Sequence, residues 1–121
     1  MKHSEGFLQL VSEARTRVRE LDVDQTRERL TQNPRAQLID VREDSEWMNG
    51  HALNARHISK GVIERDIEQM VPDKSAEVIL YCGGGFRSIL AADALQEMGY
   101  TNVASMAGGW RAWRDNGAPT E

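Results

Sequence analysis

The residues best suited to chemistry in this chain lie around its only cysteine, Cys82, within VILYCGGGFRSILAADAL, residues 78–95. Three glycines and Arg87 stand between the thiol and a pattern rich in alanine and leucine. A cysteine reacts as its thiolate, and a helix N-terminus or a neighbouring positive charge stabilises that form. Glycines let the backbone curl, so that successive N–H groups point inward and bind an anion. The segment therefore predicts a nucleophilic thiolate in an anion-binding loop, ionised more readily than a free thiol.

Two other interpretations of this segment carry less weight. A lone cysteine is usually a small buried hydrophobe, but the position of this one between an apolar run, a glycine loop and a helix favours a reactive thiol. The glycines are also typical of phosphate-binding loops. However, neither G-x-x-x-x-G-K-[ST] nor G-x-G-x-x-G occurs in the chain, and glycine turns alone are weak support for a nucleotide site.

The elements that must position this loop alternate between strands and helices. Short apolar runs predict strands, and apolar residues at a spacing near 3.6 predict helices. The predicted strands cover residues 21–23, 36–42, 55–58, 77–82 and 102–106, and the predicted helices cover residues 1–20, 24–30, 60–70, 86–99 and 108–117. We expect Asp24 to cap the second of these helices and residues 43–50 to form a loop.

Alternating strands and helices favour a parallel sheet that is covered by helices on both faces. Ligands of such sheets lie at the carboxyl ends of the strands, where Cys82 and Arg42 both fall. Arg42 is therefore a candidate binding residue. The favoured alternative is a structural ion pair of Arg42 with Asp40, Glu43 or Glu46, because charges at strand ends commonly satisfy neighbouring loops.

The beginning of the chain predicts an amphipathic helix ahead of the main domain. Its apolar side chains recur near the helical period at Phe7, Leu10, Val11, Ala14 and Val18. We divide the chain into this helix, residues 1–19, and one domain over residues 20–119. Most amphipathic helices cover the core of their own domain, so we favour that role over a partner-binding or dimer helix.

The composition narrows the class of protein. With 40% hydrophobic and 28% charged residues, the chain is typical of a globular domain. A net charge of −4 argues against a general nucleic-acid binder. One cysteine cannot form an internal disulfide, which suits a reducing compartment. Without a signal-peptide pattern or a long apolar run, we expect a cytoplasmic protein with no membrane or nucleic-acid partner.

Three segments, in this order and spacing, resemble the rhodanese family of sulfurtransferases. They are LIDVREDSEWMNGHALNARHI over residues 38–58, YCGGGFRSILAADALQEMGY around the cysteine, and NVASMAGGWRAWRDNG over residues 102–117. The similarity spans residues 20–117. It implies a three-layer α/β/α fold with a central parallel five-stranded sheet, here preceded by the N-terminal helix.

The resemblance also implies a reaction and its residues. Family members attack a sulfane-sulfur donor such as thiosulfate with the loop cysteine, form a cysteine persulfide and pass the sulfur to cyanide or a thiol. Cys82 would be the nucleophile. The implied substrate-binding residues are Gly83, Gly84, Gly85, Phe86, Arg87 and Ser88. The implied partners are small sulfur-containing anions, thiol or cyanide acceptors and, as a further option, a protein sulfur acceptor. No metal or organic cofactor is implied.

The loop departs from the family pattern at two positions. Many members carry Arg or Lys directly after the cysteine, where this chain has Gly83, so thiosulfate binding is expected to be weaker. Phe86 replaces a residue that is frequently small or polar, and it either narrows the entrance or packs on the following helix.

Other functions remain as alternatives to a sulfurtransferase. A persulfide carrier without turnover and a partner-binding module share the same fold. Cysteine-dependent phosphatases and arsenate reductases carry C-x5-R, which is one residue longer than the C-x4-R formed here by Cys82 and Arg87. Of the other polar and aromatic candidates, the three histidines and the pair Trp110 and Trp113 are expected to have structural roles.

Overall fold

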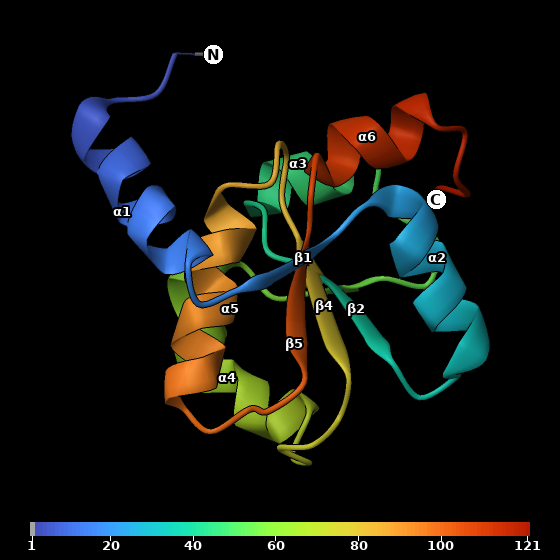
Figure 1. Ribbon diagram of the computed structural model, residues 1–121. Helices are drawn as coiled ribbons and strands as arrows, with labels where there is room; N and C mark the ends of the chain where they lie inside the picture. Colours follow the sequence, from blue (N-terminus) through green and yellow to red (C-terminus); the bar gives the residue numbers. More distant parts are fainter. Residues whose placement is uncertain (1) are drawn as a thin grey trace.

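The computed structural model describes residues 2–121 and contains five parallel strands in one sheet (Figure 1). The strands are β1 (Arg19–Leu21), β2 (Gln37–Asp40), β3 (Arg56–His57), β4 (Val78–Tyr81) and β5 (Val103–Met106). Their order is β1-β5-β4-β2-β3, and every pairing is parallel. Both the predicted fold class and the five-stranded sheet are confirmed.

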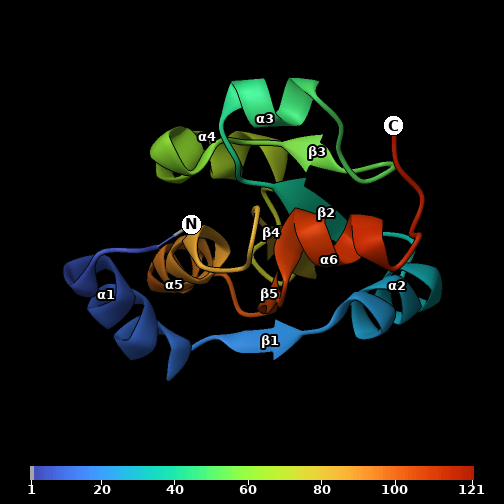
Figure 2. The same ribbon diagram turned by 90° about the horizontal axis from the view of Figure 1, so that it is seen from above.

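The described chain also contains six α-helices and a short 3-10 helix. They are α1 (Glu5–Arg15), α2 (Val23–Gln32), α3 (Asp44–Met48), η1 (Lys60–Val62), α4 (Ile63–Met70), α5 (Arg87–Glu97) and α6 (Gly109–Asp115). Seen from above, α1, α4 and α5 lie on one side of the sheet, and α2 and α6 lie on the other (Figure 2). No helix within residues 2–121 has the length and apolar character needed to span a membrane.

The central strand β4 divides the core into two clusters because successive side chains of a strand point to opposite faces. Val78, Leu80 and then Cys82 face the cluster shared with α1, α4 and α5. Ile79 and Tyr81 face the cluster shared with α2 and α6. All five side chains are at most 1% exposed. This alternation places the sulfur on the same side of the sheet as the beginning of α5.

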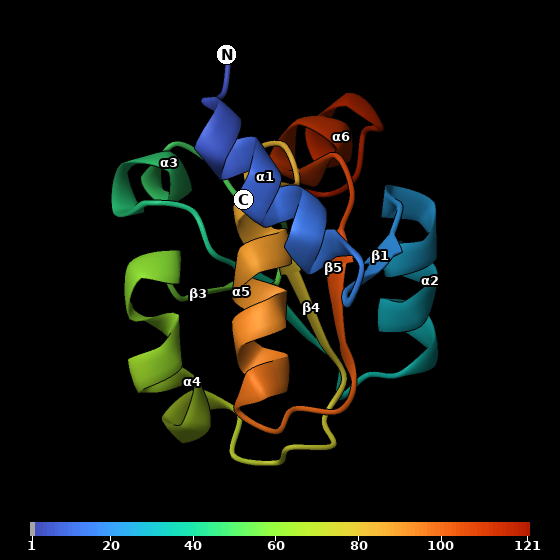
Figure 3. The same ribbon diagram turned by 60° about the vertical axis from the view of Figure 1, so that its left-hand side comes forward.

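Helix α1 packs along α5 on the outside of the domain (Figure 3). Val11 and Ala14 are buried in the first core cluster, as expected for a helix that covers its own domain. Just beyond α1, Arg17 donates two hydrogen bonds to the carboxylate of Asp93 on α5, at 2.9 and 2.8 Å. The apolar Leu10 on the outer side of α1 is 60% exposed.

Several predicted boundaries were wrong, for local reasons. The helix predicted over residues 1–20 starts at Glu5 and ends at Arg15, because residues 19–21 pair with β5; its predicted first residue, Met1, lies outside the described residues. Residues 43–50, predicted as a loop, contain α3. The Glu43 and Glu46 side chains form reciprocal capping bonds that stabilise this short helix.

The cap of α2 is Asp22 and not the predicted Asp24. The Asp22 side chain accepts a hydrogen bond from the Gln25 backbone N–H at 2.7 Å, and the Gln25 side chain accepts one from the Asp22 N–H at 2.9 Å. Asp24 lies inside the first turn. The backbone N–H groups of Asp22 and Gln25 are therefore each satisfied by the side chain of the other residue.

We expect Asp22→Ala to lower the free energy of unfolding by about 1 kcal/mol, because it leaves an N-terminal amide of α2 without its acceptor. Urea denaturation followed by circular dichroism measures the difference. Asp24→Ala is the matched control and should cost less, since it removes only a favourable charge from the first turn. Equal losses in the two variants would contradict the assignment of the cap.

Candidate active site

Cys82 lies at the carboxyl end of β4, at the floor of a cleft. Its sulfur accepts hydrogen bonds from the backbone N–H groups of Gly85 at 3.2 Å and Ser88 at 3.4 Å. The residue is only 1% exposed. The predicted glycine loop therefore does turn amides toward the sulfur, an arrangement that stabilises negative charge on it.

The loop is held in this shape by the beginning of α6. The N–H groups of Trp110 and Arg111 donate to the carbonyls of Cys82 and Gly83, at 2.7 and 3.2 Å. Gly109 permits this approach, because a Cβ there would collide with the Cys82 carbonyl. Two backbone segments far apart in sequence thus meet with no side chain between them.

Gly85 is the second position at which only glycine fits. Its φ is +98°, a left-handed conformation that other residues rarely adopt. A Cβ there would lie 3.0 Å from the backbone nitrogen of Gly108. The turn at Gly85 is what directs its own N–H at the sulfur of Cys82.

Two buried serines extend the polar surroundings of the sulfur. The Ser88 hydroxyl lies 3.5 Å from the Cys82 sulfur and 2.8 Å from the hydroxyl of Ser105 on β5. Both serines are 0% exposed. Ser88 was predicted as a site residue, but Ser105 was missed. The sequence feature that could have identified Ser105 is a single hydroxyl within the otherwise apolar strand VASM.

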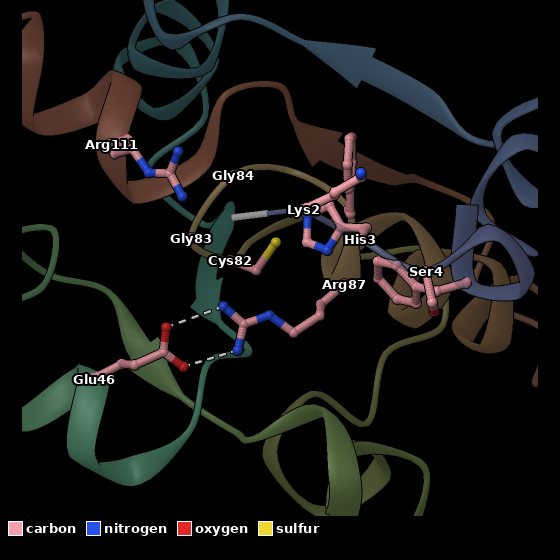
Figure 4. Close-up of a pocket in the computed structure, with 11 residues that line it drawn as sticks. Lys2, His3, Ser4, Glu46, Cys82, Gly83, Gly84, Arg87 and Arg111 are labelled. Carbon is pink, nitrogen blue, oxygen red and sulfur yellow. Dashed lines mark hydrogen bonds and ion pairs between the residues drawn. The ribbon is translucent and has the colours of Figure 1, made fainter.

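Arg87 does not point freely at the sulfur but pairs with Glu46 of α3 (Figure 4). Two hydrogen bonds, of 2.8 and 3.0 Å, join its guanidinium to the Glu46 carboxylate. The hydrogen bond lowers the pKa of Glu46 and raises the pKa of Arg87, so both groups are charged at neutral pH. Glu46 is a site residue that the sequence prediction treated only as a partner for Arg42.

Gly83 explains how Arg87 reaches this position. A Cβ at Gly83 would lie 3.0 Å from a terminal nitrogen of Arg87 and 3.8 Å from a carboxylate oxygen of Glu46. A longer side chain at this position would therefore compete with the Arg87–Glu46 pair for space. Here the positive charge is supplied from the start of α5.

Arg42, predicted as a binding residue, is not brought to the cleft. It is 3% exposed and pairs with Asp40, with its closest contact at 2.7 Å. It also donates to the Gly50 carbonyl at 2.7 Å. Its Nε and Nη2 donate to the Asp40 carboxylate, so the favoured alternative of an ion pair with Asp40 is the one observed. We leave Arg42 out of the proposed binding residues.

The cleft above the sulfur has a volume of about 860 Å³ and reaches well beyond the cysteine loop. It is lined by Lys2, His3, Ser4, Phe7, Glu46, Cys82, Gly83, Gly84, Phe86, Arg87 and Arg111. Phe86 both lines it and packs near the rings of His3 and Phe7. The four N-terminal residues were not predicted, since sequence alone does not show that α1 brings them over the loop.

The remaining aromatic and histidine residues lie outside this cleft. The ring of Trp47 stacks against His51 and against His57, with centroids 3.4 and 4.9 Å apart. Trp113 is buried and donates to the Pro119 carbonyl. Within residues 2–121, no group of His, Cys, Asp and Glu side chains is placed to hold a metal ion.

Comparison of the sequence with known protein families gives a match over most of the chain. Residues 22–116 match the family described as Rhodanese-like domain. The Bacillus subtilis protein YtwF, named a putative sulfurtransferase, is 32% identical over 102 residues, which cover 84% of this chain and 96% of YtwF.

Two solved structures cover nearly the whole chain. A Rhodopseudomonas palustris protein of unknown function, described as a possible tyrosine phosphatase, has a TM-score of 0.84 at 26% identity and covers 100% of this chain and 98% of its own. The polysulfide-sulfur transferase homodimer of Wolinella succinogenes has a TM-score of 0.81 at 26% identity. The match covers 96% of this chain and 87% of the Wolinella chain. Both matches therefore include the N-terminal helix.

We expect Glu46→Gln to strengthen anion binding about three- to tenfold, because it removes a carboxylate from the cleft and frees Arg87 from its counter-ion. Calorimetric titration with thiosulfate, in a Cys82→Ser background that prevents reaction, measures the dissociation constant. Glu64→Gln makes the same charge change on the exposed side of α4 and should leave the constant as it is. Weaker binding in Glu46→Gln would mean that the carboxylate positions Arg87 for the anion.

Proposed function

This chain belongs to the rhodanese family, and on that premise we propose that it moves sulfane sulfur from a donor such as thiosulfate to a thiophilic acceptor through a persulfide on Cys82. The observation that carries the proposal is a sulfur at the floor of a cleft with two backbone N–H groups directed at it, at 3.2 and 3.4 Å. A reduced thiol is required, which is consistent with the expected cytoplasmic setting.

In the loading step, the Cys82 thiolate attacks the outer sulfur of thiosulfate. The sulfur–sulfur bond of the donor breaks and its electron pair leaves with sulfite, so a persulfide anion replaces the thiolate. Sulfite is a good leaving group, and the step needs no general acid. The amides of Gly85 and Ser88 and the guanidinium of Arg87 are placed to offset the negative charge as it spreads over the sulfurs.

In the unloading step, cyanide or a thiolate attacks the outer sulfur of the persulfide. The new bond forms to the acceptor, and the electron pair of the broken bond returns to Cys82 as a thiolate. The hydroxyl of Ser88, backed by Ser105, is near enough to stabilise that thiolate. The same chemistry serves a carrier that delivers to one protein partner, which is the alternative form of this function.

The C-x4-R loop argues against phosphatase activity, despite the description of one structural neighbour. Cysteine phosphatases carry C-x5-R, and the longer ring makes room for a phosphate. We therefore keep sulfur transfer as the one proposed activity.

We expect Cys82→Ala to abolish both persulfide formation and thiocyanate production while leaving the protein folded, because no second thiol exists in the chain. Intact mass spectrometry after mixing with thiosulfate should show a gain of one sulfur in the wild type, lost again on adding cyanide. The variant should show no gain, and its melting curve confirms that it folds. Thiocyanate production by folded Cys82→Ala would refute the assignment.

We expect Arg87→Ala to raise the KM for thiosulfate about tenfold, because the half-buried guanidinium is the cation at the cysteine loop. Steady-state thiocyanate formation gives the constant. Arg65→Ala removes an arginine that is also paired with a neighbouring carboxylate, Asp66, but lies outside the cleft. An unchanged KM in Arg87→Ala would exclude this role.

A further inference from the structure

We propose that residues 2–7, Phe86 and Arg111 form a second subsite above Cys82, which binds an acidic organic thiol of low molecular weight as the sulfur acceptor. This inference rests on the proposed function, since it names the acceptor class for the same cysteine. It concerns the part of the cleft that the cysteine loop does not make, where the N-terminal segment and α6 face one another (Figure 4).

The size of the cleft is the first argument. Its volume of about 860 Å³ falls in the range of roughly 300–1,000 Å³ that is typical of sites for organic ligands. Thiosulfate and cyanide occupy only a small fraction of such a space. The remaining volume leaves room for a ligand with an organic body.

An aromatic wall gives that body a surface to lie on. The rings of His3 and Phe86 have centroids 4.9 Å apart, those of His3 and Phe7 are 5.1 Å apart, and those of Phe7 and Phe86 are 6.3 Å apart. Arg15 backs the Phe86 ring at 5.7 Å. Because α1 is tied to α5 through Arg17 and Asp93, this wall belongs to the folded domain.

The charges in the cleft select an acidic ligand. Lys2, Arg87 and Arg111 line it against the single carboxylate of Glu46, although the whole chain has a net charge of −4. Glu46 is already paired with Arg87. Among residues 2–121, no carboxylate lies within ion-pair distance of Arg111 or Lys2, so these two cations are available to the carboxylate of a ligand.

The depth of the sulfur selects the shape of the thiol. Cys82 is 1% exposed, so an acceptor must reach the floor of the cleft with a thiol on a slender, unbranched arm. Its thiolate attacks the outer sulfur of the Cys82 persulfide, the persulfide bond breaks, and its electron pair returns to Cys82. The products are the persulfide of the acceptor and the free Cys82 thiolate.

The test separates loading from unloading. The protein is loaded with thiosulfate, freed of excess donor and mixed with 6-mercaptohexanoate or with 6-mercaptohexan-1-ol, two linear thiols that differ in their carboxylate. Loss of the extra sulfur is followed by mass spectrometry. For the wild type we expect the acid to react about tenfold faster than the alcohol at equal thiolate concentration, with a ratio that falls as salt is added.

The matched variants locate the carboxylate. Arg111→Gln and Lys2→Gln should each lower the acid-to-alcohol ratio about three- to fivefold, the range expected for an exposed ion pair. Arg114→Gln, on the same helix but outside the cleft, should keep the wild-type ratio. A ratio near one in the wild type, or one that neither cleft variant changes, overturns the subsite. Failure to load with thiosulfate would instead count against the proposed function.

Discussion

The active-site loop depends on two hydrogen bonds made by a helix that lies more than twenty residues further along the chain. The N–H groups of Trp110 and Arg111 bind the carbonyls of Cys82 and Gly83. These bonds fix the start of the loop against α6, and the amides of Gly85 and Ser88 further along it reach the sulfur. An anion-binding loop results without a lysine or arginine directly after the cysteine. Gly109 is as much a part of the site as the glycines after the thiol, because a side chain there would push the two backbones apart.

The charges around the sulfur differ in sign from the net charge of the chain. The chain is acidic overall, yet most of its charge near the sulfur is positive. Glu46 is the counter-ion of Arg87, and it lies on α3, the helix that follows β2. The buried pair of Arg42 with Asp40 shows the other use of an arginine at a strand end, namely to satisfy a carboxylate that is 0% exposed.

Local sequence patterns were enough to predict the sheet, the long helices and the cysteine loop, because apolar periodicity and glycine placement act within a few residues. They failed where side chains decide a short element, as with the capping bonds of Glu43 and Glu46 that form α3. They also failed where distant segments meet. Neither Ser105 under Ser88 nor the N-terminal residues over the cleft could be located before the packing of β5 and α1 was known. The placement of Arg42 depended on whether it contacts the cleft or one of three nearby carboxylates, Asp40, Glu43 or Glu46, and periodicity carries no information on that choice.

The recessed position of Cys82 also bears on how this protein tolerates oxidation. A disulfide requires two sulfurs about 2 Å apart with their β-carbons about 4 Å apart. At 1% exposure, beneath a rim built from three separate segments, the sulfur cannot approach that of a second folded copy so closely. Oxidative stress should therefore leave the folded chains without disulfides between them, even though each chain carries a free cysteine.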